Sequence, residues 1–166
     1  MKNFLLTLIL VFCSSSNMIY ANNLENEDLK LPLPMPYKGV LVDKNTLDKF
    51  VESAINNNKK PMLVFGANWC GDCRILFGTF ELPTFKKMLD ENYSILKIDV
   101  KRYEINMHIM NELGLEPKKG IPRVVVMDNK KNILNLETTF EWTTARERTK
   151  QEMLSLIHIS EPTRPY

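Results

Sequence analysis

The sequence predicts an α/β fold in which helices cover both faces of a central mixed sheet of four to five strands. Strand-like apolar segments alternate with amphipathic helical segments along most of the chain. One segment, Met62–Phe65, is apolar at every position, which is typical of a strand buried on both faces. Further along, polar residues 128–132 separate two short apolar segments and predict a hairpin.

The expected element order is β-α-β-α-β-α-β-β-α. The predicted strands are apolar segments between turn signals, at 40–42, 62–67, 93–100, 123–127 and 133–136. The predicted helices begin near residues 43–45, 70, 83, 105 and 143–144. Asp43 or Asn45 can cap the first helix, and Pro83 suits the first turn of the third. Gly114 is expected to end the fourth.

Length and charge restrict the possible functions. The chain has 166 residues, of which 44% are hydrophobic, and this suits one domain with appendages. The formal net charge is +2, and the sequence has no basic stripe interleaved with aromatic residues. Nucleic acid is therefore not an expected partner, and we expect a monomer.

The first 21 residues have the pattern of a secretory signal peptide. Lys2 precedes an apolar run at 4–12, a polar stretch follows, and Ala21 is the expected last residue removed. The run is short for a membrane anchor, which needs about 20 residues. Lipidation at Cys13 is disfavoured because the bulky Phe12 precedes it. We therefore expect export, to the periplasm.

The two ends of the remaining chain are expected to lie outside the fold. Residues 22–36 are polar and then Pro-rich, which predicts an extended linker, and the folded domain is expected at 37–153. Residues 154–166 resemble translated sequencing-adapter sequence, so we expect a non-native tail and a missing true C-terminus. The alternative is a natural Pro-rich tail.

Cys70 and Cys73 would be the only cysteines after removal of the signal peptide. They are too close in sequence to close a loop of structural value, so a redox pair is the better interpretation. At the first turn of a helix, free N–H groups and the helix dipole would stabilise a thiolate at Cys70. Cys73, one turn further, can attack a mixed disulfide formed there.

No metal or cofactor is expected. Structural zinc needs four ligands, and no second Cys or His pair completes a set with Cys70 and Cys73. His108 is the only histidine outside the suspect tail. Met107 and Met110 beside it suggest a soft-metal site, but core packing explains them better.

Two motifs carry a family resemblance. Trp69-Cys70-Gly71-Asp72-Cys73 follows the buried strand, and Gly120-Ile121-Pro122 precedes a later strand. The first resembles the thioredoxin active site, and the second resembles the cis-proline loop of that family. The likeness covers roughly 37–153 and implies a thioredoxin-like fold.

The resemblance also implies roles. Cys70 would attack a substrate disulfide, and Cys73 would resolve the mixed disulfide. Trp69 would pack beside the active site and shield it, and Gly71 and Asp72 would support it from between the cysteines. Pro122, in cis, would lie against the cysteines, and the Ile121 backbone would pair with an extended substrate. The partners implied are protein disulfides or dithiols and a membrane-bound or soluble redox protein.

Two departures from the family pattern matter. Val64 stands where thioredoxin-like proteins often carry a buried acid that assists deprotonation of the second cysteine, so we do not expect that proton path here. Asp72 stands where thioredoxins commonly have proline. Its charge is expected to raise the pKa of Cys70 and make the pair more reducing, with Arg74 partly offsetting it. We therefore expect an exported reductase or interchange enzyme. The alternatives are an oxidase or isomerase of the same fold, or a non-catalytic binding module.

Overall fold

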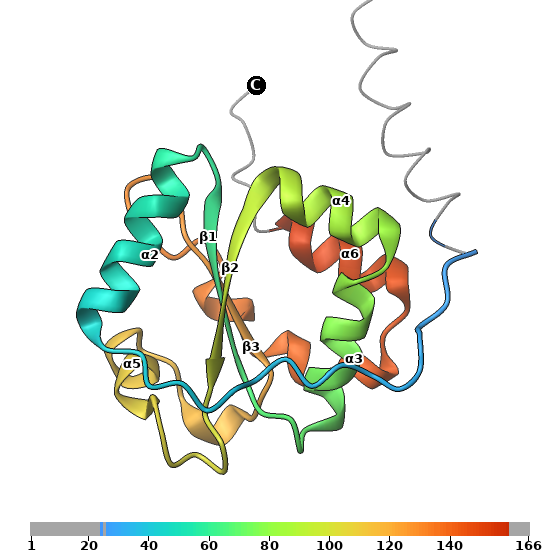
Figure 1. Cartoon of the computed structure of the whole chain (residues 1–166), viewed down its shortest axis with the longest axis horizontal. Helices are drawn as coiled ribbons and strands as arrows, with labels where there is room; N and C mark the ends of the chain where they lie inside the picture. The colour runs from blue at the N-terminus through green and yellow to red at the C-terminus, as the bar shows by residue number, and fades with distance from the viewer. Residues whose placement is uncertain (1–23, 25, 160–166) are drawn as a thin grey trace, which may run out of the picture.

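The computed structural model of the chain describes residue 24 and residues 26–159 (Figure 1). The predicted signal peptide at 1–21 therefore lies outside the described residues, as do residues 160–166 of the tail. None of the described helices is long and apolar enough to cross a membrane.

The described part is a three-stranded mixed sheet with helices on both faces, and this confirms the predicted fold class. The strands are β1 (Lys60–Gly66), β2 (Tyr93–Asp99) and β3 (Arg123–Val126), in the order β2-β1-β3. β1 runs parallel to β2 and antiparallel to β3. The helices are α2 (Lys44–Asn56), α3 (Gly71–Phe80), α4 (Pro83–Asn92), α5 (Met107–Glu112) and α6 (Lys150–Ile159). Short 3-10 segments are η1 (Pro117–Lys119), η2 (Leu136–Thr138) and η3 (Glu141–Glu147).

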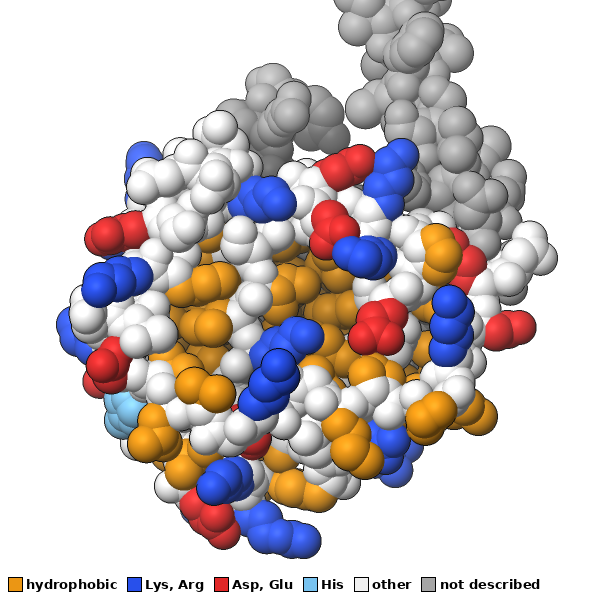
Figure 2. Space-filling view, in the orientation of Figure 1, with side chains coloured by type: hydrophobic (Ala, Val, Ile, Leu, Met, Phe, Trp, Pro, Cys, Tyr) orange, Lys and Arg blue, Asp and Glu red, His pale blue; other side chains and the backbone are white. Residues whose placement is uncertain are grey.

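The sheet separates two groups of helices. Figure 1 shows α2 and α5 on one side and α3, α4 and α6 on the other. Central β1 is fully buried from Met62 to Phe65, as its continuous apolar sequence predicts. Edge strand β2 is only half-buried in its middle, and Figure 2 shows hydrophobic side chains on the surface around it.

The predicted number of strands is wrong, because side chains replace two of the expected ladders. At 40–42 the chain forms no strand among the described residues. Instead, the Val42 N–H donates to Asn106 Oδ1 at 2.9 Å, and Asn106 Nδ2 donates to the Val40 carbonyl at 2.9 Å. One amide side chain thus supplies the partners that a neighbouring strand would have supplied.

The predicted strand at 133–136 is likewise replaced. Only one bridge, between Met127 and Ile133, remains of the expected hairpin in the described chain. Asn135 binds the β3 backbone with its side chain: Oδ1 accepts from the Val126 N–H and Nδ2 donates to the Val124 carbonyl, both at 2.9 Å. The chain then turns into η2 instead of continuing as a strand.

The predicted linker lies against the domain rather than apart from it. Arg74 of α3 donates from its terminal guanidinium nitrogen to the Leu33 carbonyl at 2.9 Å and from Nε to the Pro34 carbonyl at 3.4 Å. Gly78 makes room for the segment, since a Cβ there would lie 3.0 Å from a Leu33 methyl carbon. At the other end, α6 continues across the predicted tail boundary and buries Leu154.

Candidate active site

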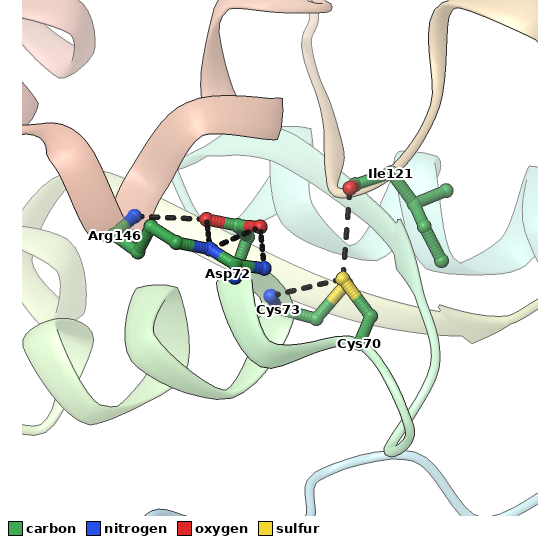
Figure 3. Close-up of polar contacts among 5 residues, drawn as sticks. All are labelled: Cys70, Asp72, Cys73, Ile121 and Arg146. Carbon is green, nitrogen blue, oxygen red and sulfur yellow. Dashed lines mark hydrogen bonds and ion pairs between the residues drawn. The ribbon is translucent and has the colours of Figure 1, made fainter.

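Cys70 sits at the junction between the sheet and α3. β1 ends at Gly66, a short loop follows, and Cys70 caps α3 with extended backbone angles of φ −81° and ψ 116°. Its Sγ accepts the Cys73 N–H at 3.3 Å, and the thiol donates to the Ile121 carbonyl at 3.6 Å (Figure 3). Both cysteines are free thiols and both are buried. Cys70 therefore lies where the sequence predicted it, at the start of a helix with free N–H groups.

The two thiols have opposite pKa shifts. The pKa of Cys70 falls from 9.0 to about 7, and its side-chain hydrogen bond with Cys73 is the largest cause. Burial opposes this shift, and the N–H groups of Cys73 and Asp72 support it. Burial and the neighbouring Cys70 raise the pKa of Cys73. Near neutral pH, Cys70 is therefore the available nucleophile and Cys73 keeps its proton.

The loop Gly120–Pro122 closes one side of the cysteine pair. The Ile121–Pro122 peptide bond is cis, as the resemblance implied. Gly120 has a φ of +82°, which a residue with a side chain rarely adopts. Ile121 directs its carbonyl at Cys70 Sγ (Figure 3). The two motifs therefore meet in space although 51 residues separate Cys70 from Ile121.

Asp72, between the cysteines, turns toward Arg146 of η3 (Figure 3). The guanidinium Nε lies 3.0 Å from each carboxylate oxygen, and a terminal nitrogen lies 2.6 Å from Oδ2. Burial raises the pKa of Asp72, but the hydrogen bonds and charge of Arg146 outweigh it, and the pKa falls overall. Asp72 is therefore a carboxylate held by a cation.

This geometry corrects two expectations. The charge of Asp72 does act to raise the pKa of Cys70, as predicted. The hydrogen bonds to Cys70 Sγ have the larger effect, however, and the pKa falls overall. Arg74 is not the cation that pairs with Asp72, since its guanidinium donates instead to the carbonyls of Leu33 and Pro34. Arg146 has that role, and its sequence context carries no signal for it.

Trp69 stands at the rim of the site. Its indole Nε1–H donates to the Lys101 carbonyl at 2.7 Å, and its ring meets Tyr103 edge-on. The Arg102 guanidinium lies over the indole at 5.6 Å from the ring centroid. Trp69 remains half exposed, so it borders the cysteine pair and offers an apolar surface to solvent.

Comparisons with known proteins agree with this geometry. The family model described as thioredoxin matches residues 37–155. The chain belongs to the thioredoxin family. A thioredoxin of Mycoplasmoides gallisepticum is 30% identical over 82 residues, which are 49% of this chain and 72% of that protein. The crystal structure of disulphide isomerase from Xylella fastidiosa Temecula1 superposes with a TM-score of 0.67 and 26% identity, covering 76% of this chain and 98% of that chain.

Val64 is the position where the sequence departs from the family pattern of a buried acid. Val64 is fully buried in β1, opposite Lys97 of β2 and Val124 of β3. It therefore supplies no acid behind Cys73. Within the described ranges, no three His, Cys, Asp or Glu side chains gather as a metal site.

Proposed function

We propose that the chain is an exported thiol-disulfide oxidoreductase that reduces or interchanges protein disulfides through the Cys70–Cys73 couple. Membership of the thioredoxin family supports thiol-disulfide chemistry in general. One observation carries the proposal for this chain. Cys70 lies at the start of α3 with a pKa of about 7; its Sγ accepts a hydrogen bond from the Cys73 N–H, and its thiol donates one to the Ile121 carbonyl.

The proposed reaction has two exchange steps. The Cys70 thiolate attacks a substrate disulfide, forms a mixed disulfide and releases one substrate sulfur, which takes up a proton. The Cys73 sulfur then attacks Cys70 Sγ, and the second substrate sulfur leaves. Two electrons have moved to the substrate, and the protein holds a Cys70–Cys73 disulfide. A membrane-bound or soluble redox partner must reduce this disulfide before the next turnover.

The thiol pKa favours reduction or interchange over strong oxidation. Strong oxidases of this chemistry hold their nucleophilic thiol at a pKa of about 3.5, whereas Cys70 is at about 7. A stable thiolate stabilises the reduced protein, so a higher thiol pKa means a more reducing pair. Equilibration in glutathione buffers measures the potential. A value near about −120 mV, as in strong oxidases, would contradict a reductase.

Turnover separates the enzyme from a binding module. We expect the reduced protein to accelerate insulin reduction by dithiothreitol, and Cys70→Ser to abolish the acceleration. Equal activity of the parent and Cys70→Ser would favour a non-catalytic module. Because the similar Xylella fastidiosa structure is named a disulphide isomerase, refolding of scrambled ribonuclease is the second assay. Activity there without insulin reduction would identify interchange as the main reaction.

Export to the periplasm is part of the same proposal. It is supported by the N-terminal sequence pattern of Lys2, the apolar run 4–12 and Ala21. The measurement is N-terminal sequencing of protein from a periplasmic extract, with residue 22 expected first. Full-length protein that begins at Met1 in the cytoplasm would overturn this part and leave the thiol chemistry untouched.

A further inference from the structure

Tyr37 is anchored beside the active-site loop. Asn68, two residues before Cys70, holds both backbone groups of Tyr37: the Tyr37 N–H donates to Asn68 Oδ1 at 3.1 Å, and Asn68 Nδ2 donates to the Tyr37 carbonyl at 2.7 Å. The Tyr37 ring meets Phe77 of α3 edge-on, with 5.6 Å between ring centroids. The side chain is 4% exposed. Its position is therefore set by both backbone and ring.

The Tyr37 hydroxyl and the Cys73 sulfur face the same small space. That space exists because Gly66, the last residue of β1, has no side chain. A Cβ at Gly66 would lie 2.2 Å from Tyr37 Oη and 2.8 Å from Cys73 Sγ. The oxygen and the sulfur are thus no further apart than the sum of these two distances.

Tyr37 Oη is buried and has no hydrogen-bond partner among the described residues. A buried hydroxyl without a partner is costly, so it does not stabilise the dithiol form. Burial is the largest cause that raises the pKa of Tyr37, and the charges of Cys73, Cys70 and Asp99 add to it. The hydroxyl therefore keeps its proton and can act as a donor.

The two carboxylates nearest this space are already occupied. Asp72 is held by Arg146. Asp99 accepts the Gly39 N–H at 2.8 Å and the Lys101 N–H at 2.7 Å. The strand position behind the pair is Val64, which cannot donate or accept a proton. Tyr103 also senses the charge of Cys73, but it lies at the exposed rim beside Trp69. Among the described tyrosines that sense Cys73, Tyr37 is the one whose hydroxyl is buried without a partner.

We propose that the Tyr37 hydroxyl donates a hydrogen bond to the Cys73 sulfur as it becomes the thiolate that resolves the mixed disulfide. This inference rests on the proposed function. In that step the Cys70–substrate S–S bond breaks and the Cys70–Cys73 bond forms. The substrate sulfur leaves with the bonding electron pair and regains the proton that Cys73 lost. Tyr37 keeps its own proton throughout, and its hydroxyl gains the partner that it lacks in the dithiol.

The test is the reaction of the reduced full chain with 5,5′-dithiobis(2-nitrobenzoate), followed by stopped flow. Attack by Cys70 releases one thionitrobenzoate, and attack by Cys73 on the mixed disulfide releases the second. We expect Tyr37→Phe to leave the first phase unchanged and to slow the second about tenfold, because a hydrogen bond to a charged sulfur is lost. The melting temperature of the reduced variant should be equal to or above that of the parent.

Tyr93→Phe is the matched control. Tyr93 is also a buried tyrosine, but its hydroxyl donates to the Ile157 carbonyl at 3.3 Å, and it pairs with Lys60 at the far end of β1 from Gly66. We expect it to leave both phases unchanged. An unchanged second phase in Tyr37→Phe, or equal slowing of both phases, would overturn the inference. Absence of the first phase in the parent protein would instead overturn the proposed function.

Discussion

Arg146 binds Asp72 with both its side chain and its backbone. Its N–H lies 2.9 Å from Asp72 Oδ1, and its guanidinium contacts both carboxylate oxygens at 2.6 to 3.0 Å. The two residues are 74 positions apart in the chain. Packing of η3 against α3 brings them together, with Trp142 of η3 buried edge-on against Phe80 of α3. The charge that Cys70 senses from Asp72 is therefore partly cancelled by a residue from the last quarter of the chain.

The Asp72–Arg146 ion pair should tune the redox potential of Cys70 and Cys73. Asp72→Asn removes a negative charge beside the Cys70 thiolate, so the reduced form becomes more stable and the potential rises. Arg146→Gln removes the cancelling positive charge and should lower it. We expect shifts of about 10 to 30 mV, measured in glutathione buffers, because the pair is partly exposed to solvent and therefore screened.

Arg146→Lys distinguishes the effect of the positive charge of Arg146 from the effect of its hydrogen bonds to Asp72. Lysine keeps the positive charge but not the two-pronged geometry. If charge dominates, its potential stays closer to the parent than that of Arg146→Gln. If the potential falls equally in Arg146→Lys and Arg146→Gln, the hydrogen bonds of Arg146, rather than its charge, control the redox potential of the cysteines.

Cys70 should titrate near neutral pH. With a pKa lowered to about 7, its thiolate fraction rises as pH increases through 7, and so should its rate of alkylation by iodoacetamide. Cys73, with its raised pKa, should remain unmodified over pH 5 to about 8.5 in the folded protein. Peptide mass mapping after timed quenching checks both statements. A midpoint near 9.0, the ordinary value, would contradict the thiolate stabilisation at α3.

Removing the resolving sulfur should trap substrates. Cys73→Ser keeps the Cys70 nucleophile but prevents the second exchange step, so mixed disulfides accumulate at Cys70. We expect reductant-sensitive complexes on non-reducing gels, identified by mass spectrometry after expression in the native cells. Cys70→Ser under the same conditions is the control. Equal numbers of complexes in both variants would contradict the assigned order of attack.

Arg74 should contribute to stability rather than to redox chemistry. Arg74→Met removes the donors to the Leu33 and Pro34 carbonyls and should lower the free energy of unfolding by about 1 to 2 kcal/mol. The reaction rate of Cys70 should stay unchanged. Lys44→Met, which breaks only an exposed ion pair with Asp48, should change stability by about 0.5 kcal/mol or less in urea unfolding. Equal stability of the parent and Arg74→Met would mean that these contacts do not hold the segment in solution.

Local patterns in the sequence were sufficient for the central part of the fold. The continuous apolar run of β1 and the start of α3 at the cysteine motif depend on residues that are adjacent in sequence. The meeting of Cys70 with Ile121 followed from a family resemblance that carries the tertiary arrangement with it. These features were predicted because each has its own signal in the sequence.

The remaining features depend on distant partners. The strand at 40–42 fails because Asn106 supplies its hydrogen bonds, and the strand at 133–136 fails because Asn135 binds the β3 backbone with its side chain. Arg146 looks like any surface arginine until η3 packs on α3. The Tyr37 hydroxyl can lie close to the Cys73 sulfur only because Gly66 has no side chain. None of these relationships has a local pattern.

The Asp72–Arg146 contact also has a consequence during synthesis. A nascent chain presents Asp72 beside Cys70 long before Arg146, 74 residues later, has been made. The hydrogen bonds that lower the pKa of Cys70 come from Asp72 and Cys73, so they need only the first turn of α3. The Asp72 carboxylate gains its cation only once η3 has docked on α3, and the counter-charge is therefore the last part of the site to be added during synthesis.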